Sequence, residues 1–322
     1  MDNCRGILYA FGKGLLDSMR GILVLGYLDK EMNERSFGKS PVKVTQKTKD
    51  DAAIKPTKHF EESKVLKRFL QGCFLNGFIF LLSIILFNYG ALPALKLLLT
   101  FLFGESSSTG MFMWNLMEWV LSRIFEVCWV IPLFFLIKVI NCFWFQDIAD
   151  SCFRFYRGRP QFMSSLSKLI ADSLFSTLVQ TLFLIQSMLV NLIPIMFVAE
   201  IACMVHICLL YSLYAFEYKW FNLGWELHRR LTFIENNWPY FIGFGMPLAI
   251  LTQFTSSLYI SGSIFSILFP IFIISGNEAS PVTGKCDYPL RLFSPVVAIS
   301  NYIFNQSIGQ SSRTIQSAPV RR

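Results

Sequence analysis

Long apolar runs constrain this chain more than any other feature of its sequence. Hydrophobic stretches with few interruptions cover residues 74–102, 119–140, 168–216 and 239–275. A helix of about twenty apolar residues is long enough to cross the hydrocarbon core of a bilayer, and helices satisfy their own backbone hydrogen bonds there. The sequence therefore predicts an all-α fold, a multi-pass bundle of transmembrane helices.

The composition and the charge agree with this class. Hydrophobic residues make up 53% of the chain and charged residues 16%, against roughly 25% charged in soluble domains. The net charge is +8, and Lys and Arg are crowded in residues 1–68. Basic segments beside apolar spans are typical of contact with an anionic cytoplasmic leaflet. Because no nucleic-acid motif accompanies the charge, we expect membrane lipids as partners and no nucleic acid.

Interruptions in the apolar runs predict about six hydrophobic segments, some of them paired as helical hairpins. Residues 168–216 are too long for one span and break near Asn191 and Pro194, and residues 239–275 bend near the polar stretch 252–263. Residues 240–252 would give only about 20 Å of helix against about 30 Å of hydrocarbon. We therefore expect this segment to enter the bilayer only partly.

The chain divides into four predicted segments. Apolar residues at helical spacing near the start predict an amphipathic interfacial helix, and the polar stretches before and after the apolar runs predict a linker and a flexible tail. Alternation of basic and uncharged loops predicts that both termini are cytosolic. The segments are 1–28 (interfacial helix), 29–68 (basic linker), 69–304 (transmembrane domain) and 305–322 (basic tail).

Charges inside the apolar runs are candidate functional residues, because a charge in the bilayer is costly. Arg123 and Glu126 are three residues apart and are expected to pair with each other or with neighbours. Glu200 lies mid-span without a local partner; it is either functional or a protonated, hydrogen-bonded carboxyl near a hairpin turn. Glu226 and Arg230, four apart on a polar helix, are expected to form a structural pair.

The stretch "WFQDIAD" (residues 144–150) follows an apolar run and contains Asp147 and Asp150. Such a pair could be a metal or acid–base site of a phospholipid-head-group transferase, whose motif begins D-x-x-D-G. Here Ser151 replaces the glycine, and Asp172 is followed by Ser176 where a second aspartate would be needed as a further metal ligand. We interpret Asp147, Asp150 and Arg154 as the solvated edge of an interfacial helix. The sequence predicts neither an enzyme nor a cofactor or metal site.

Four blocks carry a resemblance to a known family. They are "VINCFWFQDIAD" (139–150), "LLYSLYAFEYKWFN" (209–222), "IENNWPYFIGFGMPLA" (234–249) and "SILFPIFIISGNEA" (266–279). Together they resemble the etoposide-induced protein 2.4 family, and the likeness runs from about residue 66 to 304.

The resemblance implies a multi-pass protein of the endoplasmic reticulum membrane. It also implies a role in autophagy, in the maturation of autophagosomes to degradative autolysosomes, and in growth suppression and apoptosis. The expected partners are lipids and other membrane or autophagy proteins. The bacterial sulfate permeases of the CysZ type are relatives of this family. They suggest an alternative, a small-anion transporter or channel, which would need cations or helix N-termini along its path.

Overall fold

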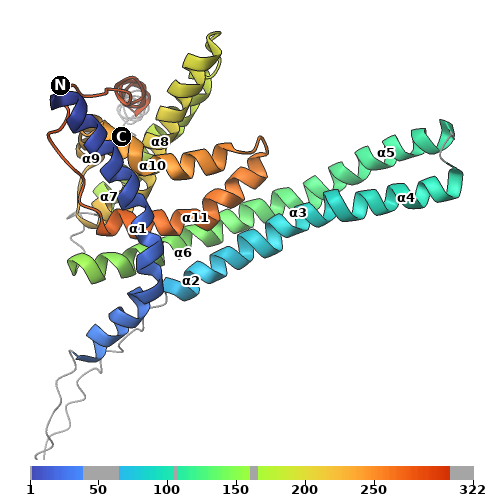
Figure 1. Ribbon diagram of the computed structural model, residues 1–322, viewed down its shortest axis with the longest axis horizontal. Coiled ribbons are helices and arrows are strands. Elements are labelled where there is room, and N and C mark those ends of the chain that lie inside the picture. Colours follow the sequence, from blue (N-terminus) through green and yellow to red (C-terminus); the bar gives the residue numbers. More distant parts are fainter. Residues whose placement is uncertain (1, 39–64, 105–107, 160–165, 305–322) are drawn as a thin grey trace, which may run out of the picture. The chain divides into compact units, whose positions relative to one another are not determined.

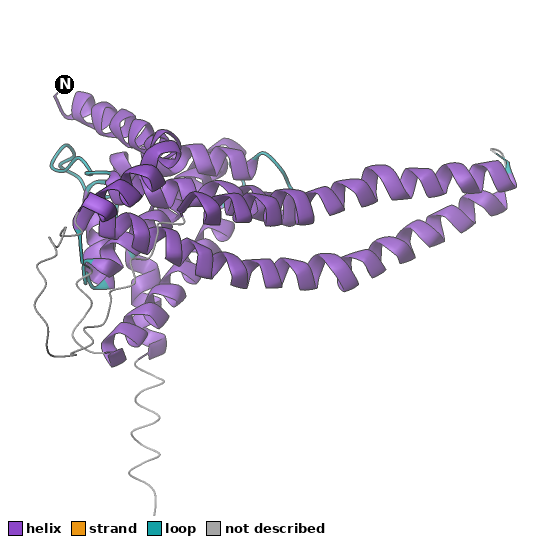
Figure 2. Cartoon of the chain, turned by 90° about the horizontal axis from the view of Figure 1, so that it is seen from below, coloured by secondary structure: helices purple, strands orange, loops and turns teal. Residues whose placement is uncertain are grey.

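The computed structural model describes residues 2–38, 65–104, 108–159 and 166–304, and within them it contains helices and no strands (Figures 1 and 2). The main elements are α1 (Asp2–Gly38), α2 (Val65–Cys73), η1 (Phe74–Leu81), α3 (Leu82–Leu86), η2 (Phe87–Ala91), α4 (Leu92–Phe103), α5 (Ser108–Phe125), η3 (Glu126–Val130), α6 (Ile131–Arg157), α7 (Leu166–Val190), α8 (Met196–Asn222), α9 (Leu227–Asn236), α10 (Trp238–Gln253) and α11 (Leu258–Glu278). The η elements are π-helical turns inside continuous helices.

Five helices in the described part of the chain are long and apolar enough to cross a membrane. They are Val65–Leu102, Gly110–Arg157, Ile170–Val190, Met196–Asn222 and Leu258–Glu278. The helix α10, with 16 residues, is shorter, about 24 Å. The predicted all-α, multi-pass fold is confirmed. The break after Val190 and the bend after Gln253 also lie where the sequence predicts them.

The chain forms two compact units, and each is described here by itself. The first unit contains residues Met1–Arg20, Tyr156–Phe254 and Ser275–Arg322, and the second contains Gly21–Phe155 and Thr255–Ile274.

A long antiparallel hairpin dominates the second unit, with α2 to α4 on one side and α5 to α6 on the other (Figures 1 and 2). Near its base, Asn76 and Asn141 exchange two buried side-chain hydrogen bonds of 3.1 and 3.0 Å. Further along, the rings of Phe87 and Phe125 stack with centroids 3.9 Å apart. The two arms therefore remain paired well beyond the base.

The polar stretch at residues 88–90 and the following Pro93 do not break the first apolar helix. The helix continues through this point as the π-helical turn η2, and α4 begins at Leu92 with Pro93 in its first turn. Proline is tolerated there because the first N–H groups of a helix have no intrahelical partner, and a π-helical turn can absorb the local mismatch.

The short helix α10 lies in the core of the first unit, where α1 and α8 pack against it. A Cβ atom on Gly14 of α1 would overlap the backbone carbonyl oxygen of Tyr240, and one on Gly245 of α10 would overlap that of Cys208 in α8. Glycine at these crossings lets the helix backbones approach closely, as in many membrane bundles. Two glycines therefore permit the close contacts that α10 makes with both neighbours.

The N-terminal helix is longer than the predicted residues 1–28, because α1 continues to Gly38. One face is packed into the protein: Asp17 and Ser18 are buried. The opposite face exposes apolar side chains, among them Leu8 and Leu16. Residues 39–64 of the predicted linker and the predicted tail, 305–322, lie outside the described residues.

Candidate functional site

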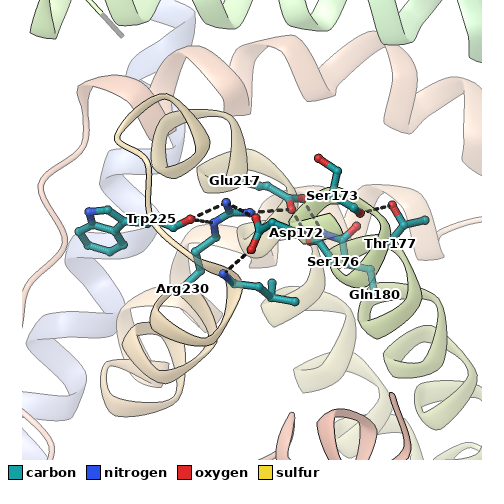
Figure 3. A network of polar contacts seen from close by, with 9 residues as sticks. Asp172, Ser173, Ser176, Thr177, Gln180, Glu217, Trp225 and Arg230 are labelled. Carbon is teal, nitrogen blue, oxygen red and sulfur yellow. Dashed lines mark hydrogen bonds and ion pairs between the residues drawn. The ribbon is translucent and has the colours of Figure 1, made fainter. Parts of the chain in front are cut away.

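A buried charge cluster of the first unit is centred on Arg230, in α9 (Figure 3). Its side chain is only 1% exposed, and its guanidinium group forms ion pairs with Asp172 of α7, at 2.7 Å, and with Glu217 of α8, at 3.2 Å. The same group donates to the carbonyl oxygen of Trp225 at 2.8 and 2.5 Å. One arginine thus links three helices and the loop before α9.

The two carboxylates of this cluster have further donors. The backbone N–H of Leu227 donates to Asp172 at 2.9 Å, at the first residue of α9. The side chain of Gln180 donates to Glu217 at 2.5 Å, and the hydroxyl of Ser176 donates to the other oxygen of Glu217. Both acids are therefore held in place from more than one side.

The chemistry of this network is that of a structural joint. It contains one cation and two carboxylates, and the oxygens of those carboxylates accept hydrogen bonds from the protein itself. Within the part of the chain that the structure describes, no three His, Cys, Asp or Glu side chains gather closely enough to hold a metal ion. Buried ion pairs require this kind of hydrogen-bond saturation, because desolvation of each charge is costly. The arrangement fixes the start of α9 against the α7–α8 hairpin.

A second buried cation lies near the end of α8. The Lys219 side chain, 3% exposed, donates to the carbonyl oxygens of Gly276 at 3.0 Å and Ala279 at 2.5 Å. These carbonyls belong to the last turn of α11 and the residue after it, where backbone acceptors lack intrahelical partners. Lys219 therefore caps the C-terminus of α11, a position where a positive charge is also favoured by the helix dipole.

The third polar contact of the first unit attaches α1. Asp17 is buried and accepts hydrogen bonds from Lys13 at 2.5 Å and from the Tyr240 hydroxyl at 2.9 Å. The hydroxyl of Ser275 in α11 donates to the backbone carbonyl of Ser18 at 2.8 Å. The N-terminal helix is thus held by polar contacts to α10 and α11 as well as by close glycine packing.

The predicted intramembrane charges occupy different settings. In the second unit, Arg123 and Glu126 form an ion pair at 2.6 Å, and the Tyr259 hydroxyl donates to Glu126 at 3.1 Å. The Arg123 side chain remains 59% exposed. In the first unit, Glu200 is exposed near the start of α8 and has no ion pair or side-chain hydrogen bond among the described residues. Glu200 therefore belongs to a different unit from the other two charges.

The residues of "WFQDIAD" lie on α6. Asp147 is 54% exposed and pairs with Arg68 at 3.1 Å, and Asp150 accepts a hydrogen bond from Gln146 at 2.9 Å. Arg154 is exposed. The buried positions of the stretch are Phe145, Ile148 and Ala149, and they alternate with the aspartates along the helix.

Sequence reasoning missed the principal network. The expected partner of Arg230 was Glu226, four residues away, whereas its guanidinium binds Asp172 and Glu217. A signal was present in α7, where Asp172, Ser176 and Gln180 recur every four residues and so line one face of an otherwise apolar helix. Their partners on α8 and α9 could not be identified from spacing alone.

The fold and these contacts define a class, that of polytopic helical membrane proteins with buried polar joints and an exposed apolar hairpin. Within this class, residues 60–270 match the family model described as "Sulfate transporter CysZ/Etoposide-induced protein 2.4". The chain belongs to this family, as its sequence blocks suggest. No solved structure matches the chain.

Three relatives illustrate the similarity. The chain is 33% identical over 186 residues to Ectopic P granules protein 4 of Caenorhabditis elegans, a match that covers 58% of each chain. It is 29% identical over 247 residues to Protein EI24 homolog of Arabidopsis thaliana, covering 68% of this chain and 76% of the relative. It is 31% identical over 225 residues to Protein EI24 homolog of Dictyostelium discoideum, covering 68% of both.

Proposed function

We propose that this membrane protein acts in the endoplasmic reticulum, where it promotes autophagy at the maturation of autophagosomes to degradative autolysosomes. Growth suppression and apoptosis are further roles that the family resemblance implies. The protein works through contacts with lipids or other proteins rather than through catalysis. Both termini are cytosolic in this proposal.

The observation that carries the contact role is the exposed apolar surface of the hairpin. The hairpin has two arms, Val65–Leu102 and Gly110–Arg157. In the most apolar 18-residue stretch of each arm, only 17% and 11% of the stretch, respectively, is buried inside the protein. The side chains of Phe74, Phe101 and Phe135 are each more than half exposed. Apolar surface of this extent is stable only when lipid or another protein covers it.

The second candidate is a small-anion transporter, which the family description itself names. A path for anions needs cations or helix N-termini directed at it. Arg230 and Lys219, the buried Lys and Arg side chains among the described residues of the first unit, instead donate to oxygen atoms of the protein. These contacts favour the contact role over the transport role.

Rescue of autophagic flux in cells that lack the protein tests the first candidate. We expect wild type to restore flux, and we expect the Asp147→Asn/Asp150→Asn variant to do the same, because an exposed ion pair is worth only about 0–1 kcal/mol. Normal abundance of this variant with no flux would instead make the stretch a functional site. Loss of a divalent metal from the variant would then indicate a metal centre, and no such loss would indicate a partner contact.

Two further measurements complete the test. Sulfate uptake into proteoliposomes of purified protein would support the transport candidate if it exceeded that of protein-free vesicles. Protease added after selective permeabilisation of the plasma membrane should digest tags at both termini, and a reticulum marker should coincide with the protein. Protection of either tag would contradict the proposed orientation.

A further inference from the structure

Lys138, in α6 of the second unit, is a charged residue without a charged partner. Its ammonium group lies over the ring of Phe134, 5.1 Å from the centroid, and over that of Phe265 in α11, at 5.8 Å. It forms no hydrogen bond or ion pair with any residue that the structure describes. Aromatic rings attract a cation, but they leave its three N–H donors without an oxygen acceptor. The position therefore offers donors that no described residue uses.

Lys138 lies close to the middle of an apolar span. On this arm of the hairpin, Glu126 pairs with Arg123 at 2.6 Å and Asp147 pairs with Arg68 at 3.1 Å. These two acids are twenty-one residues apart, about 32 Å of helix, close to the hydrocarbon thickness of about 30 Å. Lys138 is the only charged residue between them, about 18 Å from the first and about 14 Å from the second. A tilted hairpin would bring more of α5 into the bilayer and would still leave Lys138 in hydrocarbon.

The Lys138 side chain does not extend toward the nearer interface. Long basic side chains in membrane spans usually reach the interface with their charged end. Here the ammonium group lies over Phe134, four residues earlier in α6, and so on the side of Lys138 away from Asp147. Side chains of a helix lean toward its N-terminus, which explains this direction. The charge therefore remains near the bilayer centre, where an unpaired charge is costly.

The surroundings of the ammonium group differ from those of an anion path. A Cβ atom added to Gly262 would be 3.7 Å from the Lys138 Nζ atom, so α11 passes directly beside it. The hydroxyls of Ser263 and Ser266 donate to backbone carbonyl oxygens of that same helix. Pores for anions carry rings of basic side chains, whereas residues 258–274 of α11 contain no charge. A single cation between aromatic rings fits one fixed carboxylate better than a mobile anion.

An exposed face of α6 lies next to Lys138. The side chains of Phe135 and Val139 are 65% and 57% exposed, and Cys142 is exposed as well. Phe135, Lys138 and Cys142 are spaced by three and four residues, which is the spacing of a seam between two transmembrane helices packed with a left-handed twist. Lys138 itself is partly exposed at the border of this face. A helix that packs against Phe135 and Cys142 would therefore have Lys138 within its contact surface.

We propose that this face of α6 binds a transmembrane helix of another protein, one with an Asp or Glu near the middle of its span, whose carboxylate pairs with Lys138. This inference names the kind of partner in the proposed contact role and rests on that role. The charge of Lys138 selects the partner, because one ion pair then replaces an unpaired charge in each of two membrane helices. A second copy of the chain fits less well, since Glu126 lies at another depth and is already paired with Arg123.

The test uses full-length protein with a donor dye in phosphatidylcholine vesicles, and a synthetic Leu/Ala-rich transmembrane peptide with an acceptor dye. By energy transfer, we expect a peptide with one central Asp to bind about fivefold more tightly than the same peptide with Asn. Lys138→Met should remove this preference, and Lys138→Arg should keep it. Lys96→Met is the matched control, because the Lys96 ammonium group also lies over a ring, that of Trp114 at 5.7 Å, twenty-four residues before Lys138. This variant should prefer the Asp peptide as wild type does.

Further readouts separate the alternatives. Equal binding of the Asp and Asn peptides to wild type overturns the inference. A lower melting temperature of Lys138→Met in detergent also overturns it, because Lys138 would then stabilise the fold itself. Energy transfer between two labelled copies that Lys138→Met abolishes would identify a second copy as the occupant, and sulfate uptake that Lys138→Met abolishes would assign the cation to an anion path; either result overturns the inference. Flux rescue by wild type is measured separately, so the proposed function can fail or stand without the peptide result.

Discussion

Removal of the Arg230 side chain should destabilise the first unit far more than removal of any exposed charge. The Arg230→Met variant keeps a long apolar side chain but leaves the carboxylates of Asp172 and Glu217 without their cation. Those carboxylates are only 9% and 23% exposed, so solvent cannot replace the guanidinium. Breaking a buried ion pair by removing one partner costs about 3–5 kcal/mol.

The neighbouring residue gives a matched control. Arg229 lies on the same helix, with its guanidinium carbon 4.1 Å from the centroid of the Trp225 ring. An exposed cation–π contact of this kind contributes about 0.5–1 kcal/mol, so Arg229→Met should have a small effect. Arg230→Lys should lie between the two, because it keeps the charge but loses the planar fork that binds both acids.

Thermal unfolding in detergent, monitored by tryptophan fluorescence, gives the melting temperatures of these variants. The triple variant Asp172→Asn/Glu217→Gln/Arg230→Met removes all three charges and should recover most of the loss, because no uncompensated charge remains. Equal melting temperatures for Arg230→Met and Arg229→Met would refute the reasoning. Failure of the triple variant to improve on Arg230→Met would show that packing, not charge, determines the loss.

Three further predictions test other contacts. Gly14→Ala should lower the melting temperature, because the added Cβ would overlap the backbone of α10. In Gly12→Ala, on the same helix, the added Cβ meets nothing within 4 Å, so this variant should stabilise the protein by about 0.5–1 kcal/mol. A loss of stability in both variants would contradict the packing argument. Asn141→Leu should cost about 1–3 kcal/mol because it leaves the buried Asn76 Oδ1 without its donor, although Asn76 Nδ2 keeps its bond to the Gly72 carbonyl oxygen. The double Leu variant should be close to wild type, as thermal unfolding would reveal. Burial raises the pKa of the Glu235 carboxyl group. Its contribution to stability is therefore fully present below the ordinary glutamate pKa and is lost as pH rises through the raised pKa of the folded protein. Glu235→Gln should flatten the pH dependence of the melting temperature, and an unchanged pH profile would refute the raised pKa.

The helical organisation could be predicted from sequence because its signals are local. The break near Asn191 and Pro194 and the bend after Gln253 each combine a polar or proline-containing stretch with apolar runs of the right length. The π-helical turn at residues 87–91, which carries the helix past a polar cluster and Pro93, could not be predicted, because such turns have no simple sequence pattern.

The candidate site could be predicted only where both partners were close in sequence. Arg123 and Glu126 are three residues apart and do pair. Arg230 binds Asp172 and Glu217, which are 58 and 13 positions away, so their contact depends on the packing of α7, α8 and α9. Spacing along one helix carries no information on which helix lies opposite.

The polar network also bears on the choice between contact and transport. For Arg230 to bind a passing anion, its guanidinium would have to leave a carboxylate or the Trp225 carbonyl. That exchange would also release Asp172, which holds the first N–H of α9, so transport would loosen the joint with every cycle. A cation whose N–H donors all bind protein oxygens stabilises the packing of the helices. A cation that lines an anion path must instead keep an N–H donor available for the anion. The same geometry therefore makes Arg230 suited to holding α7, α8 and α9 together.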